Sequence, residues 1–372
     1  MISAIQPYIG VYRPRFGLVS SVTPSTQLFQ DLAVPYSFNV YSPLGEKLNV
    51  GASDLASATA SAKTIAMGDL HGSFHKLFET LIATGLVNMP APQVKRFTEL
   101  THQALDKQRV KELQALIPSM QWQAGRQLIL MGDIIGDRGP IDTLTLDIIE
   151  HLRKDHPDRI INIASNHDHG AFDYWMTGQP VMFPAHQASM MRALILAEDK
   201  NALREKYARF LSHTKLMHYQ PETQALYVHT PLKADTMKSL FSALQQAGLW
   251  HVPYEQMSAK HLPDFVETAN RFYRDYLVSA MQHGQGNWVA EKFFSEHKDG
   301  FLWVRSRLSN TKKLPFYQQG VRFLVHGHDQ KSQYSGYSIF NGVRPDYNVV
   351  NLDQEVRKGY MPCAETSPLF LT

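Results

Sequence analysis

The sequence has 372 residues, and its 37 lysines and arginines against 34 aspartates and glutamates leave a formal net charge of +3. This near balance argues against a protein dedicated to nucleic-acid binding, which needs a strongly basic surface. Apolar residues make up 44% of the chain and aromatic residues 11%, enough for a large core, so intrinsic disorder is excluded.

Cysteine content and hydropathy exclude cysteine-rich proteins and proteins that span a membrane. The single cysteine, Cys363, cannot build an intrachain disulfide framework or a cysteine-rich zinc module. No stretch approaches the roughly 20 apolar residues of a membrane span. Prolines and arginines interrupt the first 20 residues where a signal peptide needs an apolar run. We therefore expect a cytosolic protein without a membrane span.

The chain divides into three predicted parts. Residues 1–62 lack helical periodicity and end in the small-residue stretch GASDLASATASA, so they are expected to be an N-terminal extension and linker. Residues 63–360 alternate short apolar runs with amphipathic segments, which predicts one layered α/β domain. Residues 361–372 are expected to be a C-terminal tail.

Strands and helices are predicted from this alternation. Short apolar runs followed directly by polar residues predict strands at 63–67, 127–131, 159–164, 225–228 and 321–325. Amphipathic segments predict helices at 74–84, 142–154, 188–197 and 202–213. A further helical group from 236 to 294 suggests an α-helical insertion within about 171–300. Near the end, 337–340 and 347–352 are predicted strands joined by a turn containing Asn341-Gly342.

Polar clusters follow five of the predicted strands. They are GDLHG at 68–72, GDIIGDRG at 132–139, NHD at 166–168, His229, and HGH at 326–328. In open α/β sheets, ligands bind beyond the carboxyl ends of the strands. One histidine after a strand is usually incidental, but five successive clusters predict one composite site.

The chemistry of these clusters suits a pair of divalent metal ions. Asp69 and His71 are two residues apart, so their side chains share a face and can bind one ion. Asp133, at the end of the neighbouring strand, is placed to bridge to a second ion, which Asn166, His229 and His328 would complete. Carboxylate, imidazole and amide ligands favour Mn, Fe or Zn. Such metal pairs polarise a phosphoryl group and supply a hydroxide for in-line attack.

The motifs GDLHG, GDIIGDRG, SNHDHG, VHT and VHGHDQ resemble those of the calcineurin-like metallophosphoesterases, and the first three resemble the phosphoprotein phosphatase branch. The segment LWVR at 302–305 and the segment YNVVNLD at 347–353 are also similar to that branch. The resemblance covers 68–328, most of the chain. It implies a two-sheet β-sandwich core flanked by helices, and a metal-dependent phosphatase acting on phosphoproteins.

Metal ligands follow from the resemblance residue by residue. It implies two divalent ions, with Mn²⁺ first and Fe or Zn as alternatives. The first ion would bind Asp69, His71 and Asp133, and the second would bind Asp133, Asn166, His229 and His328. The alternative is that these side chains only cap strand-to-helix turns, as aspartate and asparagine commonly do.

The remaining catalytic roles are also implied by the resemblance. Arg138 and Arg305, with Asn166, would bind the phosphate oxygens, a task that guanidinium geometry suits. His167 would protonate the leaving oxygen as general acid, and Asp137 would orient His167. For Arg305 the alternative is an ordinary surface or ion-paired arginine.

The sequence departs from the family pattern at four places. Three residues, at 134–136, separate Asp133 from the DRG triplet where the family has two, so we expect Asp137 and Arg138 to be shifted. Ser165 replaces a glycine before Asn-His, and Thr230-Pro231 replaces glycines after the metal histidine. His326 stands where relatives often have no ligand, and we expect it to support the site or to face the substrate.

Two other functions remain open. A nucleotide or diadenosine polyphosphate hydrolase of the same fold would need aromatic side chains near the site to stack on a base, and Tyr174, Trp175 and Phe183 are the candidates. A partner-binding module with weak catalysis would use the helical insertion. Six intact ligand positions argue against such a module, because an inactive scaffold has no chemical need for them.

The N-terminal extension, the helical insertion and the expanded GDIIGDRG loop together resemble the Wip effector phosphatases of Legionella. These proteins are injected into host cells. The resemblance implies a bacterial effector that acts in the host cytosol on host phosphoproteins, with a host protein partner bound through the insertion. A bacterial cytosolic enzyme is the alternative.

Overall fold

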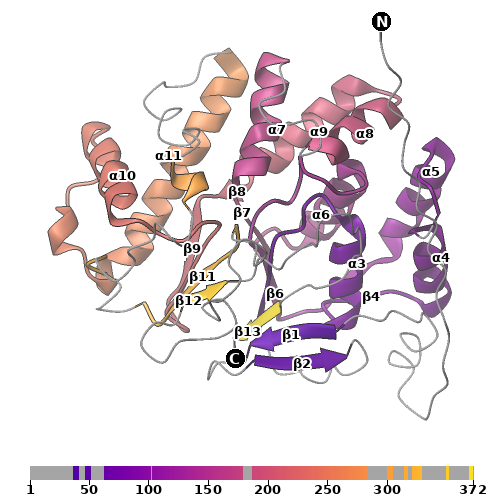
Figure 1. The fold of residues 1–372 in the computed structure, drawn as a ribbon, viewed down its shortest axis with the longest axis horizontal. Helices are drawn as coiled ribbons and strands as arrows, with labels where there is room; N and C mark the ends of the chain where they lie inside the picture. Colours follow the sequence, from indigo (N-terminus) through magenta and orange to yellow (C-terminus); the bar gives the residue numbers. More distant parts are fainter. Residues whose placement is uncertain are drawn as a thin grey trace, which may run out of the picture.

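The computed structural model describes residues 63–101, 103–178, 187–283, 300–304, 314–316 and 321–328, and the backbone of strands at 37–41, 47–51, 349–351 and 368–371. Strands and helices alternate in this part of the chain and form a mixed α/β fold (Figure 1). The predicted combination of a parallel sheet with helices is therefore confirmed.

Seven strands form the larger sheet: β1 (Ser37–Tyr41), β2 (Lys47–Gly51), β3 (Thr64–Met67), β6 (Gln127–Leu130), β7 (Ile160–Ile163), β8 (Thr214–Lys215) and β13 (Pro368–Leu371). Their order is β2-β1-β13-β3-β6-β7-β8. The neighbours β3, β6, β7 and β8 run parallel, so their carboxyl ends meet at one edge. The strand β13 pairs antiparallel with β3 and parallel with β1.

A smaller sheet has the order β12-β11-β10-β9. Its strands are β9 (Met217–Gln220), β10 (Ala225–Val228), β11 (Phe323–His326) and β12 (Val349–Asn351), and a separate pair consists of β4 (Val87–Asn88) and β5 (Gln121–Trp122). Because β10 and β11 run parallel, their carboxyl ends also meet at one edge.

Apolar side chains of both sheets meet in one buried cluster. Side chains two residues apart share a face of a strand. The large sheet contributes Ala66, Ile129, Met131, Ile161 and Ile163, and the small sheet contributes Ala225, Tyr227, Phe323 and Val325. Gln220 on β9 also donates a 2.9 Å hydrogen bond from Nε2 to the Thr64 hydroxyl on β3. The two sheets are therefore in direct contact.

Helices pack on the outer sides of the sheets (Figure 1). The helices are α3 (Phe74–Ala83), α4 (Ala91–Thr101), α5 (Lys107–Leu116), α6 (Asp142–Asp155), α7 (Asn166–Thr177), α8 (Ala188–Leu196), α9 (Lys200–Ser212), α10 (Ala234–Gln246) and α11 (Leu262–His283). Short 3-10 helices are η1 (Ile117–Ser119), η3 (Tyr254–Gln256), η4 (Ala259–His261) and η5 (Phe301–Trp303). None of the described helices is long and apolar enough to cross a membrane.

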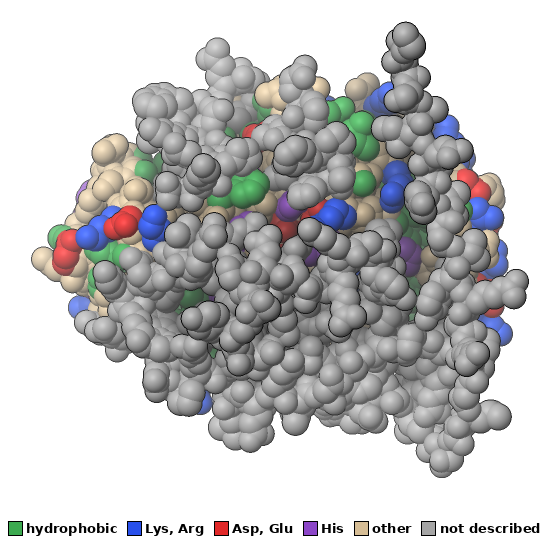
Figure 2. Space-filling model, in the orientation of Figure 1, with side chains coloured by type: hydrophobic (Ala, Val, Ile, Leu, Met, Phe, Trp, Pro, Cys, Tyr) green, Lys and Arg blue, Asp and Glu red, His purple; other side chains and the backbone are tan. Residues whose placement is uncertain are grey.

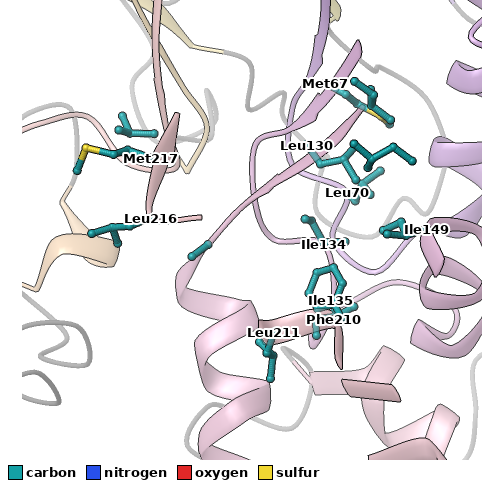
Figure 3. Close-up of a cluster of buried hydrophobic side chains, with 14 of the residues drawn as sticks. Met67, Leu70, Leu130, Ile134, Ile135, Ile149, Phe210, Leu211, Leu216 and Met217 are labelled. Atoms are coloured by element: carbon teal, nitrogen blue, oxygen red, sulfur yellow. The ribbon is translucent and has the colours of Figure 1, made fainter. Parts of the chain in front are cut away.

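The main core includes apolar side chains of the large sheet and of helices α3 to α9, and it extends to the small sheet, α10 and α11. Met67 and Leu130 project from β3 and β6 on the side opposite the cluster between the sheets, and they join Ile149 of α6 and Phe210 of α9 in the main core (Figure 3). Each of these side chains is at most 1% exposed. This apolar layer fixes the strand ends that follow Met67 and Leu130.

Most predicted elements match the structure within two residues at each end. The structure also contains α4, α5 and α7, which are not among the predicted helices. It also places 368–371 of the expected tail as β13, inside the large sheet, and 37–41 and 47–51 of the expected extension as β1 and β2. The predicted strand at 337–340 lies outside the described residues. The insertion within 171–300 stays a prediction; α10 and α11 are helices of that range.

Candidate active site

The carboxyl ends of five strands bring the predicted metal ligands together. Asp69 and His71 follow β3, Asp133 follows β6, Asn166 follows β7, His229 follows β10 and His328 follows β11. All six side chains are buried, with exposures of 6% or less. The contact between the sheets thus joins ligands that are far apart in the sequence. Figure 2 shows acidic, basic and histidine side chains next to one another in the middle of this face of the molecule.

Hydrogen bonds join the two sheets at this edge. The His328 backbone N–H donates to Asp69 Oδ2 at 2.9 Å. The preceding residue, Gly327, donates its N–H to the His229 carbonyl at 2.8 Å. The segment after β11 therefore lies against the end of β10 in its own sheet and against the end of β3 in the other.

Three predicted ligands adopt the left-handed backbone conformation. His71 (φ 54°), Asp133 (φ 47°) and His328 (φ 68°) are three of the four non-glycine residues with positive φ in the described part of the chain. Each such conformation costs about 1–3 kcal/mol and persists only where the surroundings impose it. Strain of this kind concentrates at functional sites.

Two glycines leave room for ligand side chains. A Cβ at Gly327 would lie 1.9 Å from Asp69 Oδ1. At Gly132, whose φ is +104°, a Cβ would lie 2.4 Å from His229 Nδ1. Gly132 of GDIIGDRG and Gly327 of HGH are therefore required by the close approach of the ligand side chains.

The chemistry of the His229 environment fits a bound cation. Its Nδ1 lies 2.8 Å from the Met131 carbonyl, to which it donates, so Nε2 carries a lone pair. This Nε2 lies 2.9 Å from Asn166 Oδ1 and 3.4 Å from Asp133 Oδ1. Three electron-pair donors therefore converge in a buried space, an arrangement that suits a metal ion. Ligating histidines typically donate their other ring N–H in this way.

Two groups of side chains have the spacing of metal ligands, and both contain Asp133. One comprises Asp133, His229 and His328, and the other comprises His71, Asp133 and Asp137, with ligand atoms within 4.8 Å of one another in each group. The shared Asp133 is consistent with a bridging carboxylate. Burial raises the pKa of Asp133, whereas the positive charge that His167, His229 and His71 carry when they are protonated lowers it below its usual range.

Asp137 lies closer to His71 than to His167. His71 Nδ1 is 2.6 Å from Asp137 Oδ2, whereas His167 Nε2 is 3.6 Å from the same oxygen. Because Nδ1 donates to Asp137, the lone pair of His71 is on Nε2. Burial would raise the pKa of Asp137, but His167, His71 and Arg138 lower it well below its usual range. The closest contact of this carboxylate thus differs from the predicted one.

Arg138 borders the buried groups at the surface. Its side chain is 33% exposed, and its Nε lies 3.0 Å from Asp137 Oδ1. Its Nη2 lies 3.2 Å from His71 Nδ1. His167 is buried, with Nδ1 3.3 Å from the Gly136 carbonyl. The predicted phosphate-binding arginine and the predicted general acid therefore lie on either side of Asp137.

The GDIIGDRG loop is held by a buried carboxylate from α7. Asp168 Oδ1 accepts hydrogen bonds from the backbone N–H groups of Ile134 and Ile135, each at 3.0 Å. Burial raises the pKa of Asp168 to about 8. Ser165, the departure from the family glycine, caps α7 by accepting from the Asp168 N–H at 3.1 Å. The serine thus helps to orient the helix that carries Asn166 and His167.

A second buried network supports the same loop. Ser189 on α8 accepts from the Asp137 N–H at 3.0 Å and donates its own N–H to the Asp137 carbonyl at 2.8 Å. Asp142 Oδ2 accepts from the Gly136 N–H at 2.9 Å and from the Tyr207 hydroxyl at 2.6 Å. We call Asp142, Ser189 and Tyr207 the loop support. No sequence motif marks these three residues, so they are absent from the predicted site.

The other predicted residues are placed as follows. Arg305 and Phe183 lie outside the described residues. Tyr174 and Trp175 pack against the main core, and the Trp175 ring lies 5.3 Å from the Tyr207 ring. His326 is buried, with Nδ1 2.8 Å from the Gly327 carbonyl. Thr230, another departure from the family pattern, donates its hydroxyl to the Phe301 carbonyl at 2.6 Å and so holds η5 against the segment that follows β10.

Comparisons with known proteins give a family and a fold. The sequence model of the family described as "WipA-like, phosphatase domain" matches residues 127–358. The phosphatase domain of the Legionella effector WipB is similar in structure, with a TM-score of 0.56, 17% identity, and coverage of 72% of this chain and 99% of that one. A cold-active protein-tyrosine phosphatase of a psychrophilic Shewanella species gives a TM-score of 0.43 and 15% identity. This match covers 78% of this chain and 71% of the Shewanella chain. No curated protein matches the sequence.

Proposed function

Because this chain belongs to the WipA-like phosphatase domain family, we propose that it is a metal-dependent phosphoprotein phosphatase that hydrolyses phosphoserine, phosphothreonine or phosphotyrosine monoesters. The family match confirms the resemblance to Wip-type phosphatases, and phosphatase chemistry follows from it. One observation supports metal dependence most strongly. His229 Nε2, Asn166 Oδ1 and Asp133 Oδ1 lie close together, and none of these three atoms has a hydrogen to donate to the others.

Two divalent ions, when bound, would supply Lewis-acid activation of the phosphoryl group and of the attacking water. We propose Mn²⁺ as the first choice, with Fe or Zn as alternatives, because the ligands are carboxylates, imidazoles and an amide. The ligand set is Asp69, His71 and Asp133 for one ion, and Asp133, Asn166, His229 and His328 for the other. The two groups support Asp133 as the shared ligand, with His71 on one side and His229 and His328 on the other.

The protein groups around the ions have distinct roles in this proposal. Arg138 turns a partly exposed guanidinium toward the site and binds phosphate oxygens, together with Asn166 and with Arg305 of LWVR. His167 protonates the leaving oxygen as general acid. Asp137 orients His71 at 2.6 Å and attracts the proton-bearing ring of His167 at 3.6 Å. One carboxylate therefore serves both histidines.

Two finer features of the fold are also proposed. We propose that the two sheets are the β-sandwich of a metallophosphoesterase core and that the region carrying α10 and α11 is a helical insertion. The mixed cluster of side chains from both sheets supports the sandwich. The place of β1, β2 and β13 in the large sheet supports a domain that includes strands from both terminal segments.

The setting of the enzyme is proposed by analogy. The similar WipB domain comes from a Legionella effector. We propose that this chain is likewise a translocated effector, with host phosphoproteins as substrates and a host protein bound through the insertion. The rival nucleotide hydrolase is less favoured, because Tyr174 and Trp175 pack against the main core.

The test is hydrolysis of p-nitrophenyl phosphate and of phosphoserine, phosphothreonine and phosphotyrosine peptides after EDTA treatment and readdition of Mn²⁺. Wild type should regain activity with the metal, and Asp133→Asn should not. Asp235→Asn, at an exposed position of α10, is the matched control and should behave as wild type. No hydrolysis of any substrate by the metal-loaded wild type would overturn the proposal and favour the partner-binding alternative.

A further inference from the structure

Helix α8 has a buried inner side and an exposed outer side. Its inner side contacts the GDIIGDRG loop through Ser189 and packs Met190 into the core. Its outer side exposes Met191 (38%) and Ile195 (69%), the exposed large hydrophobic residues of the described part of the chain. Single exposed apolar residues are ordinary, but two on one helix face beside a candidate active site are typical of a binding surface.

Arg192 lies between these residues in the sequence, and its side chain is bonded to the same loop. Its Nη1 donates to the Gly139 carbonyl at 3.1 Å and to the Pro140 carbonyl at 2.8 Å. These two residues directly follow Arg138. No carboxylate of the described residues forms an ion pair with Arg192, whereas Arg138 pairs with Asp137. Arg192 is thus an exposed cation, oriented by the carbonyls at the end of the GDIIGDRG loop and available to an anion.

Helix geometry arranges these residues in one continuous strip. At about 100° per residue, three-residue steps turn by about −60°, so Ser189, Arg192 and Ile195 follow one another around the helix. Met191 lies four residues before Ile195 and therefore beside it. The strip begins at the contact with Asp137 and leads outward over about 9 Å along the helix axis.

We propose that Met191, Arg192 and Ile195 form a docking surface, the α8 surface, for the substrate polypeptide beside its phosphoresidue. Arg192 pairs with a substrate carboxylate next to the phosphoresidue, and Met191 and Ile195 receive an apolar side chain. An extended peptide covers about 9 Å in about three residues, which sets the distance of the apolar residue from the phosphoresidue. The inference rests on the proposed phosphatase function, because the surface is continuous with Arg138.

The experiment uses four peptides with one phosphoresidue in common. They carry glutamate or alanine next to the phosphoresidue, and leucine or alanine three residues from it. For wild type, Arg192→Gln and Ile195→Ser, kcat/KM on each peptide is divided by kcat/KM on p-nitrophenyl phosphate. Arg192→Gln should lower this ratio about three-fold for glutamate peptides alone, the size of an exposed ion pair. Ile195→Ser should lower it about five-fold for leucine peptides alone, because less apolar surface is buried.

Arg204→Gln, an exposed arginine of α9, is the matched control and should leave every ratio unchanged. Equal ratios for all four peptides in wild type, or equal losses on all peptides in the variants, would overturn the α8 surface. If the wild type hydrolyses none of these substrates, the proposed function fails separately. Fluorescence anisotropy with a non-hydrolysable phosphonate peptide then decides the surface: weaker binding by Arg192→Gln for the glutamate peptide alone supports it, and equal binding refutes it.

Discussion

The backbone N–H of His328 donates a 2.9 Å hydrogen bond to the carboxylate of Asp69, although 259 positions separate them in the sequence. The bond connects the end of β11 in the small sheet with the end of β3 in the large sheet. It forms because Gly327 has no side chain to displace the Asp69 carboxylate. The contact between the two sheets is thus built into the candidate metal site.

Replacing Gly327 with alanine should damage this junction. The added Cβ would lie 1.9 Å from Asp69 Oδ1, so either the HGH segment or the carboxylate must move. Overpacking of this kind costs about 1–3 kcal/mol of the free energy of unfolding. We expect that loss in urea denaturation, together with the loss of at least one bound Mn²⁺.

Gly248→Ala provides the control for that substitution. Gly248 has φ +68°, and a Cβ added there would have no atom within 4 Å, so alanine adds backbone strain without a clash. It should cost about 1 kcal/mol of stability and keep metal binding. Equal metal binding by Gly327→Ala and Gly248→Ala would contradict the role of the Asp69–His328 junction.

The loop support should control turnover more than substrate affinity. Ser189→Ala and Tyr207→Phe each remove a hydrogen bond that holds Gly136 or Asp137, directly or through Asp142. A buried hydrogen bond is worth about 1 kcal/mol, so we expect that loss of stability and a kcat reduced about five-fold. Steady-state kinetics on p-nitrophenyl phosphate should show a smaller change in KM. Ser239→Ala, on the exposed side of α10, is the control, and a change confined to KM would refute the positioning role.

Asp142 predicts a pH dependence of stability. Burial raises the pKa of Asp142 to about 6 in the folded protein, from an ordinary value of 3.8. The unfolded chain therefore loses this proton first as the pH rises, and the folded state becomes less stable between about pH 4 and pH 6. The difference of about two pKa units corresponds to at most about 3 kcal/mol.

Asparagine at position 142 cannot titrate, so Asp142→Asn should lack this contribution. In EDTA, the free energy of unfolding of wild type should fall relative to that of the variant as the pH rises from 4 to 6. Above pH 6 the difference should be constant. Parallel pH profiles for the two proteins would show that Asp142 does not retain its proton in the fold.

The strand ends and their ligands could be predicted from the sequence because the signals are local. Short apolar runs such as 127–131 stop at GD, NHD or HGH, and parallel strands align these ends at one edge. Helix α7 is not predicted from the sequence, because its first residues, beginning at Asn166, form the ligand motif NHD and show no helical periodicity. The strand β13 escapes it because four residues near the chain end carry too little periodicity.

Long-range contacts account for the other differences between the predicted and the observed site. Ser189 and Tyr207 reach the loop from positions 52 and 65 residues away from their partners Asp137 and Asp142, and nothing in their local sequence marks them. The closer contact of Asp137 with His71 depends on how the expanded loop folds back, which residue spacing alone does not define. The sequence therefore predicts the ligand types better than the contacts among them.

The most direct test of the account is the number of Mn²⁺ ions bound per chain, measured by elemental analysis after EDTA treatment, metal loading and desalting. We predict two ions for wild type and for Asp235→Asn, and fewer for Asp133→Asn, whose carboxylate belongs to both ligand groups. His229→Ala should retain the ion bound by Asp69 and His71 and lose the other. No metal bound by wild type, or an undiminished count in Asp133→Asn, would contradict the binuclear centre.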